Sequence, residues 1–330
     1  MRQHQLSRRA VLAGGAVVLA LAGCSAPDGT RPPARVPDSP EQALARTLIA
    51  DKQRTIAFYT TLITKGGDSL TPWRARHAAH LAELQRRFPE LASGVGGPAS
   101  PPAPPSASAP ASAPASPPVP VSPGATAKVT LSRLRALERR SAALRTRQLA
   151  DVAPSLAQLV ASIGACEALH APATVKLPPP AAVSGSADMA LLRRVLAAEH
   201  AAIFAYGLLG ARTSGSLRTR LTRAFDDHRD RRDQLRALIT AGGGRPSEPE
   251  PSYSLPSVPS TAAAASQLAA HVETGLTAAY LELVAAADPG LRQYAALGMQ
   301  EAAIRASGFV SGTVTAFPGM PGSATPKPTG

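Results

Sequence analysis

The chain has 330 residues, of which 17% are charged and 4% aromatic, and its formal net charge at pH 7 is +13. This excess of Lys and Arg favours contact with anionic surfaces. No nucleic-acid-binding motif accompanies the charge and aromatic side chains are few, so we expect no nucleic-acid partner.

The first residues have the pattern of a bacterial export signal. A basic start is followed by an apolar run over 10–22 that closes in small residues. The run is too short to cross a membrane, which takes about 20 apolar residues. The tetrad LAGC at 21–24 matches the lipobox, in which the thiol is diacylated and the preceding peptide bond is cut. We predict a signal peptide over 1–23 and a lipoprotein held through acylated Cys24, palmitate being a typical acyl chain, on the extracytoplasmic side of the cell membrane. The alternative is an uncleaved anchor.

The signal and the segment behind it carry further information. Residues 7–12 (SRRAVL) resemble a twin-arginine signal, which leaves the export route open. Residues 24–40 contain five prolines, a composition that suits an extended tether. Acylation of Cys24 leaves Cys166 without a partner for an intrachain disulfide. Loss of Arg2, Arg8 and Arg9 with the signal lowers the formal net charge from +13 to +10.

Past the tether, apolar residues recur at steps of three and four, and no segment shows sustained alternation. This periodicity predicts an all-α protein. The predicted helices lie at 41–65, 72–92, 128–151, 154–171, 187–213, 216–240, 261–287 and 289–309. We expect two tandem ferritin-like four-helix bundles, a divergent one over 41–172 and a second over 187–320, and a disordered tail over 321–330.

The two halves look like divergent copies of one another. Residues 48–59 align with 195–206 without a gap, so that Tyr59 matches Tyr206. Residues 151–158 align with 286–293 at an offset that also pairs Glu138 with Glu273. Chance similarity between two Ala-rich helical sequences is the alternative.

Each half has one long Pro-rich connection between its second and third helices, over 98–123 and over 242–260. Such a connection can span about 60 Å when extended, whereas a helix of about 25 residues is roughly 37 Å long. It can therefore run back along the whole bundle and start helix three at the end where helix one began. One long crossover is typical of ferritin-like bundles. The alternative is a disordered hinge between two helical hairpins.

Each helix of the second half carries one ionisable residue within its apolar stripe. These residues are Glu199, His228, Glu273 and Glu301. A buried carboxylate needs a partner, a proton or a metal ion. Carboxylates and imidazoles that converge in a four-helix bundle are typical of di-iron or di-manganese sites, and mixed oxygen and nitrogen ligands suit Fe or Mn.

A family resemblance points the same way for the second half. Residues 192–210, with AEHAAIFAYG at 198–207, resemble the opening helix of a bacterial ferritin-like domain of unknown function. The segments HRDRRD at 228–233 and AFPG at 316–319 are similar to later parts of that family. The resemblance covers about 188–320 and implies the bundle fold, but no reaction, because the family has no agreed activity.

The second half departs from a full two-metal set. Phe225 stands where a Glu would precede His228, and Ile304 stands where a His would follow Glu301. Three interpretations stay open: a buried ion network balanced by arginines, a site for one or two metal ions at the four residues above, and unrelated exposed charges. The arginines available for a network are Arg231, Arg232 and Arg305.

The first half has drifted further. Lys52 takes the place of Glu199 and Cys166 that of Glu301, and an ammonium group facing Glu138 would make a neutral pair. Glu167 begins a Glu-x-x-His motif one residue out of register. We expect Cys166 to be a small core residue. His80 and Glu138 keep the places of their counterparts, so a metal site is an alternative here also. Its ligands would be His77, His80, Glu138 and His170.

Three functions are compatible with these patterns. The first is a structural or interaction module of the cell envelope, with a buried charged core and an envelope protein as partner. The second is a metal-binding or ferroxidase-like protein, and the third is a carrier of a small molecule or lipid. No nucleophile–base pair, phosphate-binding loop or redox dithiol is recognisable, which favours a non-enzymatic role.

Overall fold

The computed structural model describes residues 37–92, 128–172, 183, 185–310 and 315–322, and within these ranges it contains helices and no strand. The all-α prediction is confirmed. The first half contains α1 (Pro40–Ile63), the 3-10 helix η1 (Asp68–Leu70), α2 (Thr71–Arg87), α3 (Pro89–Ala92), α4 (Leu131–Arg145) and α5 (Pro154–His170). The second half contains α6 (Ser186–Ala211), α7 (Gly215–Ala241), α8 (Ala262–Leu283) and α9 (Pro289–Phe309).

The predicted signal peptide, Cys24 and most of the tether lie outside the described residues, as do the insert over 98–123 and the end of the tail. In the part of the chain that is described, no helix has the length and apolar character needed to cross a membrane.

Three helices end or break at least four residues earlier than predicted, and in each case a proline follows. The helix predicted over 72–92 breaks at Phe88, which precedes Pro89. The helices predicted to end at 151 and 287 stop at Arg145 and Leu283, before Pro154 and Pro289. A proline keeps the preceding residue out of the helical region and favours the first turn of a new helix. The prolines therefore mark starts of helices, and the residues before them form the turns.

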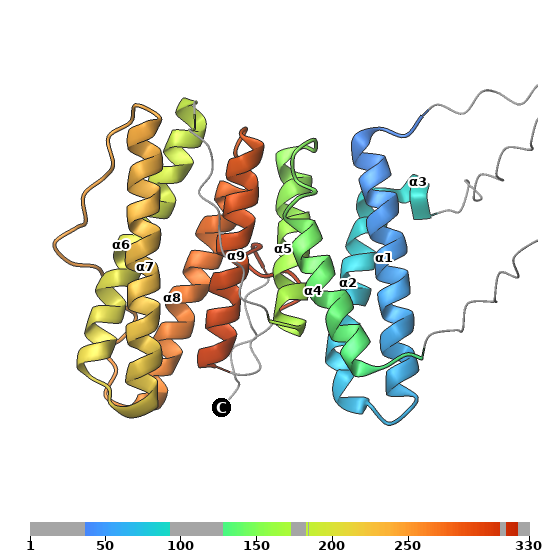
Figure 1. The fold of residues 1–330 in the computed structure, drawn as a ribbon, viewed down its shortest axis with the longest axis horizontal. Helices are drawn as coiled ribbons and strands as arrows, with labels where there is room; N and C mark the ends of the chain where they lie inside the picture. The colour runs from blue at the N-terminus through green and yellow to red at the C-terminus, as the bar shows by residue number, and fades with distance from the viewer. Residues whose placement is uncertain (1–36, 93–127, 173–182, 184, 311–314, 323–330) are drawn as a thin grey trace, which may run out of the picture. The chain divides into compact units, whose positions relative to one another are not determined.

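The contacts of the second half show which helices run in the same direction (Figure 1). Tyr206, late in α6, donates a hydrogen bond to Glu273 of α8, whereas Tyr280, later in α8, donates to Glu199, earlier in α6. Helices α6 and α8 are therefore antiparallel. Helix α7 also packs against α6 after a short turn and runs back along it. Helices α7 and α8 are thus parallel, an arrangement that needs a connection as long as the bundle.

The connection over 242–260 follows α6 along its length. The carbonyl of Arg245 accepts a hydrogen bond from Arg193, and the carbonyl of Ser247 lies 3.2 Å from Nε2 of His200. Further along, the ring of Tyr253 packs on Phe204. The connection is therefore a crossover and not a hinge. Helix α7 returns the chain to the end of the bundle where α6 began. The crossover then carries the chain back to the end where α6 ends, and α8 starts there. The prediction that helix three starts where helix one began was therefore wrong.

The first half has the same helix directions. Tyr59, late in α1, bonds to Glu138, midway along α4, and Asp51, earlier in α1, pairs with Arg145 at the end of α4. Helices α1 and α4 are therefore antiparallel, as α6 and α8 are.

Helices α5 and α9 pack against each other at the centre of the unit formed by residues 38–330 (Figure 1). Both helices are buried on almost all sides, which agrees with sequences that are apolar or small around the whole helix. Gln300 of α9 donates a hydrogen bond to the carbonyl of Ala142, and Arg292 donates to the carbonyls of Leu149 and Val152. Polar groups thus join the two halves as well as apolar packing.

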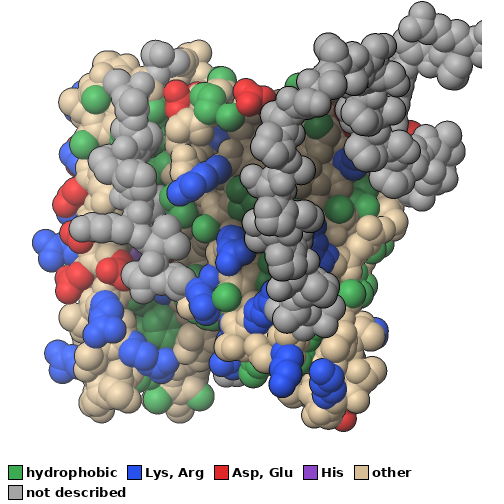
Figure 2. All heavy atoms as spheres, turned by 45° about the vertical axis from the view of Figure 1, so that its right-hand side comes forward, with side chains coloured by type: hydrophobic (Ala, Val, Ile, Leu, Met, Phe, Trp, Pro, Cys, Tyr) green, Lys and Arg blue, Asp and Glu red, His purple; other side chains and the backbone are tan. Residues whose placement is uncertain are grey.

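Basic side chains are spread over the face of the molecule shown in Figure 2 and are not gathered into one patch. The whole chain carries 35 Lys and Arg against 22 Asp and Glu. The face shown is therefore mixed in charge, and the chain as a whole has a basic excess.

We expect Arg292→Met to lower the free energy of unfolding by about 2–3 kcal/mol, because it leaves buried carbonyls of the link between α4 and α5 without their donor. Arg292 is itself buried. Urea denaturation followed by circular dichroism measures the change. Arg194→Met is the matched control, because Arg194 is 68% exposed and pairs with the exposed Glu282. Equal losses from both variants would contradict this role for Arg292.

Candidate functional site

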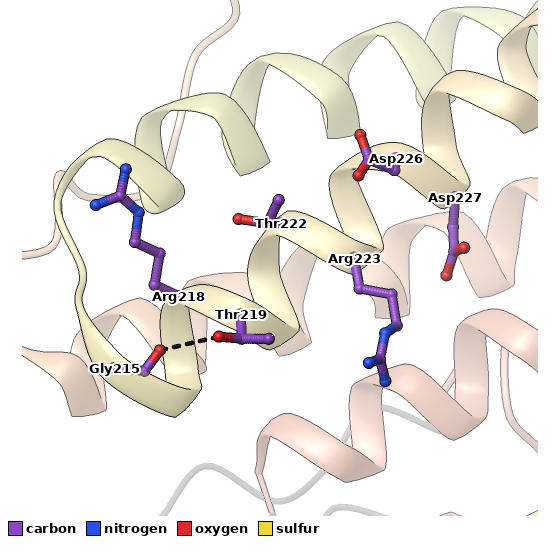
Figure 3. Close-up of a pocket in the computed structure, with 7 residues that line it drawn as sticks. All are labelled: Gly215, Arg218, Thr219, Thr222, Arg223, Asp226 and Asp227. Atoms are coloured by element: carbon purple, nitrogen blue, oxygen red, sulfur yellow. Dashed lines mark hydrogen bonds between the residues drawn. The ribbon is translucent and has the colours of Figure 1, made fainter.

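A shallow hollow lies along the first half of α7 (Figure 3). Its lining comes from one helix: Gly215, Arg218, Thr219, Thr222, Arg223, Asp226 and Asp227. All of these residues are exposed, and along the helix the two arginines come before the two aspartates. None was predicted as a site residue. The concentrated chemistry of the molecule lies elsewhere, in two buried polar clusters.

The two clusters occupy corresponding places in the two halves. The first cluster consists of Tyr59, His77, Glu138 and His170. The second cluster consists of Tyr206, His228, Glu273 and Arg305. Each is built around the carboxylate of the third helix of its half, and the offset that pairs Glu138 with Glu273 also pairs His170 with Arg305.

The second cluster holds one carboxylate oxygen among three donors. Oε1 of Glu273 accepts hydrogen bonds from the Tyr206 hydroxyl at 2.7 Å, from Nε2 of His228 at 3.1 Å and from Nε of Arg305 at 2.9 Å. The other ring nitrogen of His228, Nδ1, lies 2.7 Å from Oε2 of Glu199. Glu199, His228 and Glu273 are all fully buried.

The imidazole that bridges two carboxylates is an imidazolium. Burial penalises the charged ring, yet Glu273 and Glu199 together raise the pKa of His228 to about 9. Burial likewise opposes ionisation of Glu273, but Arg305 and His228 lower its pKa to about 2. The second cluster therefore forms a closed ion network, in which both ring nitrogens of His228 face carboxylates. The metal site predicted at these residues stays a prediction.

Three of the four residues predicted for the second half come together, and the fourth does not. Glu301 forms an ion pair with Arg231, and its side chain is 25% exposed. Of the three arginines considered for a network, Arg305 and Arg231 take part, whereas Arg232 bonds to the neighbouring Asp233. Apolar spacing placed Glu301 on the correct helix face, but it could not show that an arginine from α7 would reach it first.

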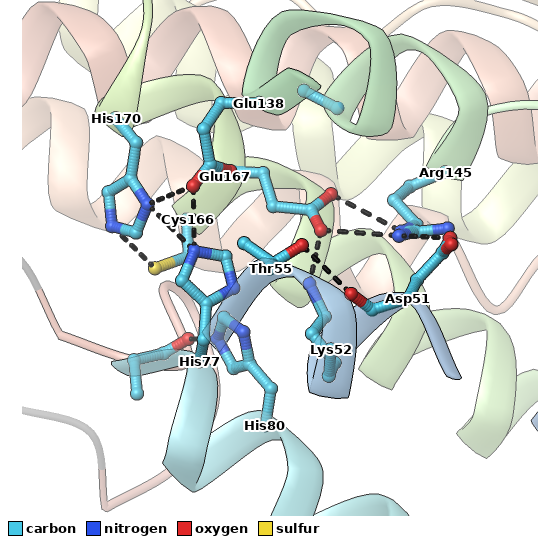
Figure 4. Close-up of polar contacts among 12 residues, drawn as sticks. Asp51, Lys52, Thr55, His77, His80, Glu138, Arg145, Cys166, Glu167 and His170 are labelled. Atoms are coloured by element: carbon cyan, nitrogen blue, oxygen red, sulfur yellow. Dashed lines mark hydrogen bonds and ion pairs between the residues drawn. The ribbon is translucent and has the colours of Figure 1, made fainter. Parts of the chain in front are cut away.

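The first cluster brings four polar atoms together at the centre of α1, α2, α4 and α5. Oε1 of Glu138 lies 2.7 Å from the Tyr59 hydroxyl, 2.8 Å from Nε2 of His77 and 3.3 Å from Nδ1 of His170. Nε2 of His77 and Nδ1 of His170 are 3.2 Å apart. Figure 4 shows both rings directed at the carboxylate. Three of the four residues predicted as ligands in this half, His77, Glu138 and His170, therefore meet.

His80 lies beside this group but is directed elsewhere. Its Nε2 donates a hydrogen bond of 2.6 Å to the carbonyl of Ala316. Burial, Lys52 and His77 hold the pKa of His80 well below its usual value. The residue that contacts the carboxylate of α4 is His77, as His228 contacts that of α8. Assigning His80 as the counterpart of His228 was therefore wrong by one helical turn.

Lys52 does not face Glu138 but forms an ion pair with Glu167, which also pairs with Arg145 at 3.2 Å (Figure 4). Arg145 in turn contacts Asp51 at 3.1 Å. The prediction that Lys52 faces and pairs with Glu138 was therefore wrong. Because α5 is buried on both faces, Glu167 and the neighbouring turn that carries His170 both point into the interior.

Cys166 is the core residue that was expected. It is fully buried, and its Sγ lies 3.7 Å from Nε2 of His170. Burial raises the pKa of the thiol to about 12, so it stays protonated and unreactive at neutral pH. The residues that sequence reasoning missed are the tyrosines of the two clusters. Their signal was the alignment of Tyr59 with Tyr206 in the repeat.

Residues 191–322 match a protein family described as Domain of unknown function (DUF4439). A conserved hypothetical protein, Rv2844, from Mycobacterium tuberculosis has a crystal structure and is 32% identical over 38% of this chain and 97% of its own, with a TM-score of 0.37. The C-terminal half of the chain belongs to the DUF4439 family. A search of curated proteins returns no match.

The imidazolium of the DUF4439 domain predicts a dependence of stability on pH. The folded pKa of His228, about 9, lies above the unfolded value of about 6.5, so its contribution is complete below pH 6.5 and is lost as the pH rises through 9. We expect the free energy of unfolding to fall by roughly 2–4 kcal/mol over this range. His77 and His80 have lowered pKa values in the folded state, so they lower the free energy of unfolding only as the pH falls below about 6.5.

Chemical denaturation at a series of pH values measures this dependence. His228→Gln should remove most of the slope between pH 6.5 and 9, whereas His271→Gln, at an exposed histidine of α8, should leave it unchanged. A His228→Gln protein with the slope of the unaltered chain would refute the assignment of the imidazolium.

Proposed function

We propose that this protein is a lipid-anchored module on the extracytoplasmic side of the cell membrane, and that its helical body is a rigid structural or interaction unit and not an enzyme. The attachment rests on the lipobox at 21–24 and the short apolar run before it. Two or more acyl chains on Cys24 hold the protein stably on the bilayer.

The observation that carries the structural role is the internal pairing of the buried charges. In the second cluster Glu273 is neutralised by Arg305 and His228, and in the first half Glu167 is neutralised by Lys52 and Arg145. Because each of these buried charges is already paired with another, none is left to bind a substrate. Such pairs favour one packing of the helices over others, because a shifted helix would leave a buried charge unpaired.

The joint between α5 and α9 supports the same role. It is closed by small and apolar side chains and by hydrogen bonds from Arg292 and Gln300, so the two halves form one body. A single stiff body on a tether is suited to hold a partner at a fixed distance from a membrane. The basic excess of the surface favours anionic headgroups as the neighbouring environment.

Cys24→Ala tests the attachment. We expect this variant to appear in the soluble fraction and to lose incorporation of a palmitate analogue, because the thiol that carries the acyl chains is gone. Cys166→Ala is the matched control: it removes the other cysteine, which is buried in α5, and should leave labelling and membrane association unchanged. Continued membrane association of Cys24→Ala would overturn the lipoprotein assignment.

A further inference from the structure

The first cluster leaves a buried carboxylate without a full positive partner. Glu138 is 1% exposed, and its nearest neighbours are two imidazoles and a phenol. The corresponding carboxylate, Glu273, has the guanidinium of Arg305 at 2.9 Å. From this contrast we propose that His77, Glu138 and His170 bind a divalent transition-metal ion of the zinc class.

The ligand atoms are already close to the separation that such an ion requires. Two ligand atoms about 2.1 Å from a tetrahedral ion lie roughly 3.4 Å apart. The three separations among Nε2 of His77, Oε1 of Glu138 and Nδ1 of His170 are 2.8, 3.2 and 3.3 Å. Movements of a few tenths of an ångström would open the site. Among the residues that the structure describes, His77, Glu138 and His170 form a group of three side chains whose ligand atoms lie close enough to share one metal ion.

The charges around the cluster leave room for a cation. Lys52 and Arg145 are occupied by Glu167 and Asp51 and make no hydrogen bond to Glu138. One carboxylate oxygen and two imidazole nitrogens face one another here, all within 3.3 Å. A carboxylate beside imidazole is a donor set that zinc-class ions take.

Two buried atoms of the cluster have no partner. Oε2 of Glu138 and Nδ1 of His77 are enclosed and make no hydrogen bond. The first could turn to a bound ion as a second carboxylate contact. The second leaves the tautomer of His77 unfixed, so that Nε2 can give up its hydrogen and face the ion. In the second cluster, by contrast, both ring nitrogens of His228 are held by carboxylates.

Arg76 is the group that opposes binding. Its Nη1 lies 3.3 Å from Nε2 of His170, a contact that favours a hydrogen on Nδ1, the nitrogen that must bind the ion. Arg76 is only half-buried and can turn toward solvent. Nε2 of His170 then keeps Sγ of Cys166 as a neighbour at 3.7 Å. Removal of Arg76 should therefore strengthen binding, whereas a merely structural cluster would gain nothing from it.

The test uses the full chain in detergent, stripped with a chelator and titrated with Zn²⁺ or Co²⁺. We expect one equivalent to bind, a rise in the melting temperature on addition of Zn²⁺, and the visible absorption of four-coordinate Co²⁺. Loss of a second-shell partner typically weakens a site 10- to 100-fold, so Glu138→Gln and His77→Ala, which remove ligands, should weaken it at least about 100-fold. Arg76→Gln should bind more tightly than the unaltered chain.

His271→Ala, at an exposed histidine, and His228→Gln, in the second cluster, are the controls and should keep the stoichiometry of one. If His77→Ala fails to fold, the nearly isosteric Glu138→Gln decides, with its fold checked by circular dichroism. Absence of binding to the unaltered chain, unchanged affinity in a folded Glu138→Gln protein, or loss of the ion in His228→Gln would each overturn the proposal.

Discussion

The structure depends on one constraint: a carboxylate taken into the helical interior must meet a positive or hydrogen-donating partner there. Glu138 and Glu273 are both buried at the centre of four helices, and each draws a tyrosine from the first helix and a histidine from the second. A carboxylate left alone would take up a proton or expel the helix that carries it. The position of the carboxylate therefore sets which faces of the surrounding helices must turn inward.

The two halves meet this constraint with different chemistry at one corresponding position. Arg305 gives Glu273 a permanent cation, and with that cation in place the neighbouring His228 is shared between two carboxylates. In the first half His170 stands at that position, and the permanent cations Lys52 and Arg145 belong to a separate network around Glu167. The change from guanidinium to imidazole thus separates a saturated network from one that retains capacity for a cation.

Sequence periodicity was sufficient for the helices and for part of the site. Glu199, His228 and Glu273 lie on apolar stripes, and a stripe shows which side chains face a core. It does not show which partner on another helix arrives first, and this is why Glu301 was assigned to the core although Arg231 holds it nearer the surface. For the same reason Lys52 was expected to pair with Glu138. Its real partner, Glu167, was discounted because one helix face was assumed to be buried, whereas α5 is buried on both.

The central position of α5 and α9 links the joint between the halves to the chemistry of the clusters. His170 and Arg305 lie on these two helices, at the ends away from Arg292 and the links that precede α5 and α9. A displacement of α5 against α9 would move His170 relative to Glu138 and Arg305 relative to Glu273 at the same time. Because close-packed helices shift between discrete packings and do not slide freely, the hydrogen bonds of Arg292 and Gln300 hold the geometry of both clusters. The joint between the halves is therefore a condition for both sites, including the one proposed to bind a metal ion.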